Sequence, residues 1–275
     1  MDLSLTEVKE RSIGIFDSGL GGLTVVKALR NISPNEDIIY FGDTGRVPYG
    51  GKSKSVILKY ADQDIKFLKS MNVKMIVAAC GTVSSCLEEV KCGKSVIGVV
   101  NPACFTAVNT TKNGKIGVMG TVTAIKNGAY KRQILNLNPS LTIFEQKCPL
   151  LVPLIEKGII TDSSAELREA VEIYTKPLLE KNIDTLILGC THYPIIKNVI
   201  QKVAGEKIKL IDSGKEAAKF VKNVLKEQKI SSLKKIEGEQ NYFVSGDVQS
   251  FSENAKMFLG YDIHKNVKKI YTDKY

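Results

Sequence analysis

Two stretches of the chain end alike, each an apolar run that closes on a cysteine with a threonine just after it. Residues 75–82 read MIVAACGT, and residues 185–191 read TLILGCT. Each run is typical of a buried strand, and open α/β sheets bind ligands beyond the carboxyl ends of their strands. If the two strand ends face each other, Cys80 and Cys190 place thiols on opposite sides of one ligand.

Two opposed thiols suit the inversion of a carbon centre by proton transfer. One deprotonated group removes a proton from one face, and the protonated group delivers one to the other face. A free thiol titrates at about 8.5, and helix N-termini or positive neighbours lower that value. We expect each cysteine at the start of a helix. His192 could share a proton with Cys190 or a substrate amine, and Asp17 is its counterpart at another strand end. Residue types alone also allow two ordinary core cysteines.

The elements that must position these residues alternate between short apolar runs and segments of helical period. Helices are expected over residues 24–31, around 56–68, and from a capping box at 163–166 to about 181. This alternation predicts βαβ units and parallel sheets. The expected strands cover residues 12–16, 37–41, 74–79, 95–100, 115–119, 184–188 and 207–211. Breaks after residues 101 and 212 predict a discontinuous first domain, 1–101 with 213–275, around a second domain of 102–212.

Composition favours an enzyme without a membrane anchor or metal. The 275 residues are 43% hydrophobic and 25% charged, the opening residues lack an apolar signal core, and no apolar run approaches the ~18 residues of a membrane span. A cytoplasmic location is therefore expected. Six cysteines without Cys-x-x-Cys spacing, and only two histidines, predict neither disulfides nor zinc. Four of them are predicted to be structural: Cys86, Cys92, Cys104 and Cys148.

The net charge of +10 raises the question of a nucleic-acid partner. Most of this charge is lysine, spread along helical segments, as at residues 52–69. Base reading relies more on arginine, so we favour solvated helix faces that could also draw an anionic substrate.

Several segments, in order along nearly the whole chain, resemble the glutamate racemases. The two most specific are GIFDSGLGGLT at 14–24 and LGCTHYP at 188–194. The other matching segments are YFGDT at 40–44, VPYG at 47–50, CGT at 80–82, VPLIE at 152–156, IDSG at 211–214 and SGD at 245–247.

This resemblance implies two similar, doubly wound, mainly parallel-sheet α/β domains with the active site between them, commonly in a homodimer. It implies interconversion of L- and D-glutamate without a cofactor, which supplies D-glutamate for peptidoglycan. Cys80 and Cys190 would be the catalytic pair, with Asp17, His192 and Glu156 as auxiliaries. Groups implied to bind the substrate are Asp17, Ser18, Pro48, Tyr49, Gly50, Gly81, Thr82, Thr191 and His192.

Two positions depart from the family pattern. Gly81 stands where the family has an asparagine whose amide would bond the substrate, and the loss of such a bond to a charged group costs about 1.5–3 kcal/mol. Water or a shifted backbone N–H could fill in. Ala124 stands near a point where the family often has threonine, and Thr123 could substitute.

Three other functions are open from the sequence. The loop at 45–53 nearly spells a P-loop, but Gly51 stands where lysine should follow the second glycine, and the 19–24 cluster fails the dinucleotide pattern. A relative acting on aspartate or another acidic amino acid is a second possibility. A non-catalytic binding protein, with a nucleic-acid or gyrase-like partner, is the third.

Overall fold

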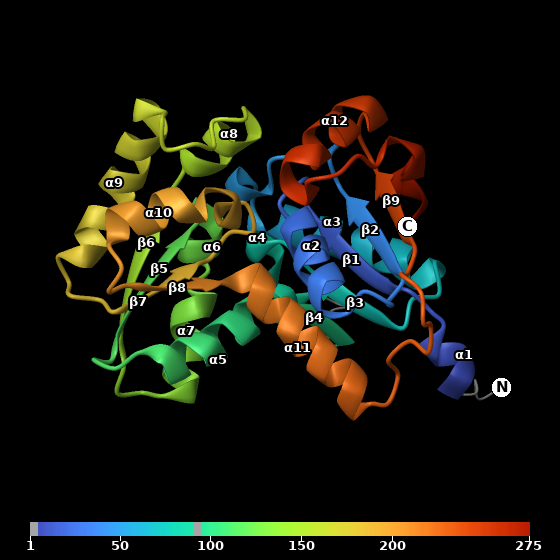
Figure 1. Ribbon diagram of the computed structural model, residues 1–275, viewed down its shortest axis with the longest axis horizontal. Helices are drawn as coiled ribbons and strands as arrows, with labels where there is room; N and C mark the ends of the chain where they lie inside the picture. Colours follow the sequence, from blue (N-terminus) through green and yellow to red (C-terminus); the bar gives the residue numbers. More distant parts are fainter. Residues whose placement is uncertain (1–4, 91–94) are drawn as a thin grey trace.

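The computed structural model describes residues 5–90 and 95–275, and the prediction for Cys92 lies outside these ranges. Two lobes are visible in Figure 1, each built on its own sheet. No described helix is long and apolar enough to cross a membrane.

The first sheet has six parallel strands in the order β10-β9-β2-β1-β3-β4. Its strands are β1 (Ile13–Asp17), β2 (Ile38–Gly42), β3 (Met75–Ala78), β4 (Val96–Gly98), β9 (Gln240–Val244) and β10 (Val267–Lys269). The central strand β1 is buried throughout, with Ile13 and Ile15 packed in one apolar cluster and Phe16 in another. Burial on both faces is what a parallel sheet covered by helices requires.

Helices cover both faces of this sheet. The helices of this lobe are α1 (Leu5–Lys9), α2 (Leu23–Ile32), α3 (Lys54–Ser70), α4 (Gly81–Ser84), α11 (Ser213–Glu227) and α12 (Val248–Leu259). Helices α11 and α12 pack on α2. Helix α3 packs on β1 and β2, and its apolar side chains belong to the second apolar cluster, the one that contains Phe16. The lysines predicted on the solvated face of α3 are exposed there, as Lys59, Lys66 and Lys69 illustrate.

The second sheet has four parallel strands in the order β6-β5-β7-β8. They are β5 (Lys115–Gly120), β6 (Thr142–Lys147), β7 (Thr185–Leu188) and β8 (Lys209–Asp212). The surrounding helices are α5 (Val100–Thr110), α6 (Val122–Lys126), α7 (Ala129–Leu137), α8 (Leu151–Glu156), α9 (Ala165–Leu179) and α10 (Lys197–Ala204). The expected fold of two parallel-sheet α/β domains is confirmed.

The chain passes twice between the two lobes, through α5 and through α11, which pack on each other (Figure 1). Asn101 and Pro102 lie in the first turn of α5, a position that tolerates proline, and Asp212 caps α11 by accepting a bond from Lys215 N at 3.0 Å. The predicted domain limits therefore fall at helix starts and stay a prediction.

Two local expectations were wrong. The cap of α9 is Ser164, whose hydroxyl accepts from Leu167 N at 3.3 Å, so Glu166 lies one residue too early to complete the expected capping box. Cys190 is followed by a 3₁₀ helix, η4 (Tyr193–Ile196), before α10, whereas Cys80 directly caps the short α4. Pro194 removes a backbone donor, which favours the tighter turn at this point.

Candidate active site

The two thiols open into one cavity of about 440 Å³ between the carboxyl ends of the two sheets. Cys80 follows β3 of the first sheet and Cys190 follows β7 of the second, and both are nearly buried. Every residue expected at the site lines this cavity with them: Asp17, Ser18, Pro48, Tyr49, Gly50, Gly81, Thr82, Glu156, Thr191 and His192. Cys148, predicted to be structural, also reaches the wall.

The surroundings of Cys80 keep its proton in place. Its Sγ donates to Ser18 Oγ at 3.6 Å, and the buried Asp17 carboxylate accepts from Gly19 N at 3.0 Å. Burial, followed by the charge of Asp17, raises the pKa of the Cys80 thiol to about 12. Burial also raises the pKa of Asp17. Cys80 is therefore suited to donate a proton at neutral pH.

Cys190 has a different neighbour. Its Sγ lies 3.7 Å from His192 Nδ1, and His192 Nε2 lies 3.0 Å from Glu156 Oε1 at the end of α8. Burial alone would lower the pKa of His192, but the hydrogen bonds to Cys190 and Glu156 raise it to about 10. Cys190 therefore has a cationic imidazole beside it, whereas the charged group nearest to Cys80 is a carboxylate.

Close packing fixes the imidazole of His192. A Cβ on Gly21 would overlap its Nδ1 and Cε1 atoms and would lie 2.7 Å from Thr191 Oγ1. Thr24, in the first turn of α2, donates from its hydroxyl to the Thr191 carbonyl at 2.9 Å. The glycine-rich turn after β1 therefore packs directly against Thr191 and His192, which follow β7 of the second lobe.

Hydroxyl groups join the two lobes at the other wall. Thr82 Oγ1 and Thr121 Oγ1 lie 3.1 Å apart, and Thr123 Oγ1 donates to the Gly50 carbonyl at 2.6 Å. Thr121 lines the cavity and caps α6, so it is a polar site residue that the sequence analysis did not single out. Thr123 and the buried Ala124 are not among the lining residues, and the Thr123 hydroxyl bonds the loop at Gly50.

The cavity-lining loop at 47–51 rests on a buried polar network. Asp64, from α3, accepts from Arg46 Nη2 at 2.8 Å and from Tyr49 Oη at 3.2 Å. Asp43 accepts from Arg46 Nε at 2.6 Å, from Ser245 Oγ at 2.7 Å and from Tyr49 Oη. Burial raises the pKa of both carboxyls. The loop that resembles a P-loop in sequence thus forms a wall of the thiol cavity, and hydrogen bonds to Asp43 and Asp64 hold it in position.

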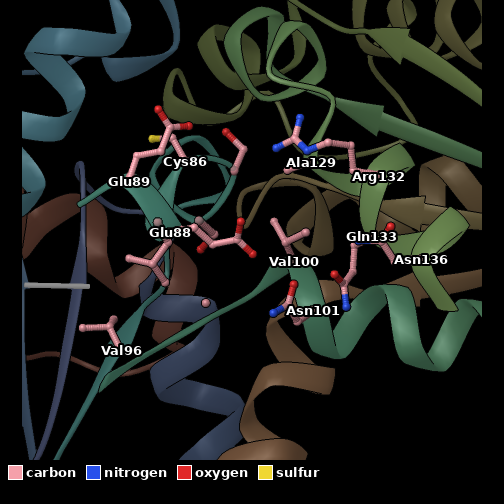
Figure 2. A pocket seen from close by; sticks show the side chains of 14 residues that line it. Cys86, Glu88, Glu89, Val96, Val100, Asn101, Ala129, Arg132, Gln133 and Asn136 are labelled. Carbon is pink, nitrogen blue, oxygen red and sulfur yellow. The ribbon is translucent and has the colours of Figure 1, made fainter. Parts of the chain in front are cut away.

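A larger cavity, of about 600 Å³, lies elsewhere, between residues 84–89, Val96 and Gly98 on one side and helices α5 and α7 on the other. Figure 2 shows Arg132 and Gln133 of α7 across from Glu88 and Glu89, with Cys86 at one side. Cys86 donates to the carbonyls of its own turn. This cavity holds neither the opposed thiols nor the histidine, so we assign the chemistry to the smaller one. Within residues 5–90 and 95–275, no cluster of three or more metal-ligating side chains occurs.

Known proteins resemble this chain in sequence and in fold. The Asp/Glu/hydantoin racemase family profile matches residues 35–221. Glutamate racemase from Geobacter metallireducens is 41% identical over 253 residues, which cover 91% of this chain and 93% of that protein. The crystal structure of glutamate racemase from Francisella tularensis in complex with D-glutamate matches with a TM-score of 0.89 and 38% identity, over 97% of this chain and 100% of that one.

A more distant structure, Picrophilus torridus aspartate racemase, shares the fold alone. It is 19% identical with a TM-score of 0.57, over 81% of this chain and 100% of that one. The family profile and the near relatives agree along most of the sequence. The chain therefore belongs to the Asp/Glu/hydantoin racemase family and is an amino-acid racemase.

Proposed function

We propose that this chain interconverts L- and D-glutamate by proton transfer between two thiols. The observation that carries this proposal is the pair Cys80 and Cys190, which enter one cavity from two different sheets. The similarity to glutamate racemases, one of them in complex with D-glutamate, supports glutamate as the substrate.

In one direction, the Cys190 thiolate removes the Cα proton and the C–H electron pair remains on the substrate carbon. Cys80 then donates its thiol proton to the opposite face of that carbon, which leaves Cys80 as the thiolate and Cys190 as the thiol. The reverse direction uses the same groups in exchanged roles. His192 stabilises the Cys190 thiolate, and Glu156 holds the imidazole from its far side.

Polar groups around the thiols would orient the substrate. Thr82, Thr121 and Thr191 offer hydroxyls, and Ser18 lies beside Cys80. Asp17 is the nearby acid that can pair with the substrate ammonium. The enzyme acts as a cytoplasmic homodimer, needs no cofactor, and supplies D-glutamate for peptidoglycan.

Racemisation of glutamate and aspartate, followed by circular dichroism without added cofactor, tests this function. Wild type should invert both enantiomers of glutamate, whereas Cys80→Ala and Cys190→Ala should each lose about 10²–10⁴-fold or more, because each removes an acid–base group. Cys104→Ala, at a buried thiol outside the cavity, is the matched control. Turnover of aspartate instead of glutamate would show a different acidic substrate, and inertness towards both would refute the catalytic proposal.

A further inference from the structure

The glycine after the first catalytic thiol lies against the backbone just before the second. A Cβ built on Gly81 would lie 2.5 Å from the Gly189 carbonyl oxygen and 3.8 Å from Cys190 Cα. Real Cβ atoms do not approach an oxygen so closely, so any side chain at position 81 requires one of the two backbone segments to shift. The two lobes meet here backbone to backbone.

Hydrogen bonds hold the Gly189 carbonyl, which faces Gly81, in place. Gly189 O accepts from Tyr130 Oη at 3.2 Å, and Gly189 N donates to Met119 O at 2.8 Å. A Cβ on Gly189 would itself lie 2.6 Å from Met119 O and 3.2 Å from the Tyr130 ring. Tyr130 is fully buried, so the strand end that carries Cys190 is held from behind.

Backbone conformation does not explain the glycine. The residues with positive φ in the described ranges include five glycines, and Gly81 is not one of them. Gly81 begins helix α4 with ordinary helical geometry, which an alanine would adopt at least as readily. Close approach of the facing carbonyl is the remaining physical reason for a residue without a side chain.

We propose that Gly81 is a positioning residue that sets the spacing of the two thiols across the cleft. Without a side chain at this position, the segments that bear Cys80 and Cys190 close on each other, and no amide from residue 81 enters the cavity. The hydroxyl pair Thr82 and Thr121, 3.1 Å apart at the same wall, then takes the place of that amide toward the substrate carboxylate. The kinetic part of this inference rests on the proposed function, whereas the spacing itself does not.

The consequence is that the family's asparagine would harm this chain. Proton transfer between fixed groups loses about 10²-fold for a displacement of 1 Å. We expect Gly81→Ala to lower kcat tenfold or more in both directions with a smaller change in KM, and Gly81→Asn to lower it about 100-fold.

A measurement independent of turnover is the rate at which iodoacetamide labels each cysteine, read by peptide mass spectrometry. Cys80 and Cys190 are 5% and 6% exposed, whereas Cys104 is 0% exposed. If the segments that carry the two thiols shift, the labelling rates of Cys80 and Cys190 should rise at least fivefold, while the rate of Cys104 should stay unchanged. Gly14→Ala is the matched control, because the three atoms nearest to its Cβ belong to the side chains of Val73 and Leu68, within the first lobe. It should lower stability without changing kcat or the labelling of either thiol.

Thiol rates within twofold of wild type in Gly81→Ala, or a Gly81→Asn kcat equal to wild type, would overturn the inference. If wild type does not racemise glutamate, the proposed function fails, and labelling alone then decides the spacing. If Gly81→Ala does not fold, Cys104 will be labelled as fast as the other cysteines. The variant Tyr130→Phe then tests the inference. That variant frees the Gly189 carbonyl and should raise labelling of Cys80 and Cys190 severalfold, and unchanged rates would overturn the inference.

Discussion

The two halves of the cavity present the same reactive group in unlike surroundings. Cys80 has a hydroxyl and a buried carboxylate beside it, whereas Cys190 has an imidazole that is in turn bonded to a carboxylate. Burial and the charge of Asp17 raise the pKa of the Cys80 thiol, whereas a histidine with a raised pKa lies beside Cys190. The comparison teaches that two similar strand ends can surround the same side chain with opposite charges, and in the proposed mechanism this difference gives Cys80 the role of acid and Cys190 that of base.

Removing the neighbour of each thiol should break this asymmetry most strongly. We expect Asp17→Asn and His192→Asn each to lower kcat about 100-fold, with unequal effects on the L-to-D and D-to-L directions, because each residue serves a different thiol. Initial rates from both enantiomers check this. Asp184→Asn is the control, since Asp184 bonds Thr111 and the backbone at residues 112 and 113 at the far end of the sheet. Equal losses in both directions for both variants would contradict separate roles.

Thiol reactivity reports the same asymmetry without substrate. At pH 8 Cys190 should be alkylated at least about tenfold faster than Cys80, because alkylation requires the thiolate and the pKa of Cys80 is raised to about 12. The difference should shrink as pH rises toward that value. Site-resolved labelling between pH 7 and 11 measures it, and a faster Cys80 at pH 8 would reverse the assignment.

Glu156 should matter less than His192. Its side chain is 42% exposed, so solvent screens its interaction with the imidazole. Glu156→Gln keeps a hydrogen-bond acceptor and should lower kcat about three- to tenfold. Glu166→Gln, on an exposed residue at the start of α9, should change nothing. A loss from Glu156→Gln as large as that from His192→Asn would mean that Glu156 takes part in proton transfer itself.

Protonation of His192 should also stabilise the fold. The pKa of His192 is about 10 in the folded chain and about 6.5 when unfolded, so its protonation stabilises the fold fully below pH 6.5 and that contribution disappears as pH rises toward 10. Urea unfolding of wild type and His192→Asn at pH 6 and 9.5 tests this. The stability advantage of wild type over the variant should fall by roughly 4 kcal/mol between the two pH values. An advantage that grows with pH would contradict the raised pKa.

The sequence predicted the buried strands because their apolar runs carry the signal, and both thiols lie where those runs end. It missed β6, β9 and β10, which have mixed burial and polar residues, such as Glu145 and Gln146 in β6. Asp64 was missed because an acid within a lysine-rich helix looks exposed, and only tertiary packing shows it under Arg46 and Tyr49. The tight fit of Gly81 against Gly189 depends on two segments 108 positions apart, which no local pattern encodes.

The most direct test of the two-thiol account follows the Cα hydrogen in D₂O during the first turnovers of L-glutamate. We expect the D-glutamate product to carry deuterium from its first appearance while recovered L-glutamate keeps protium, because the donating thiol has exchanged with solvent and the accepting thiol lies on the other face. Product that keeps the original protium would show that one group removes and returns the same proton, and would contradict the account.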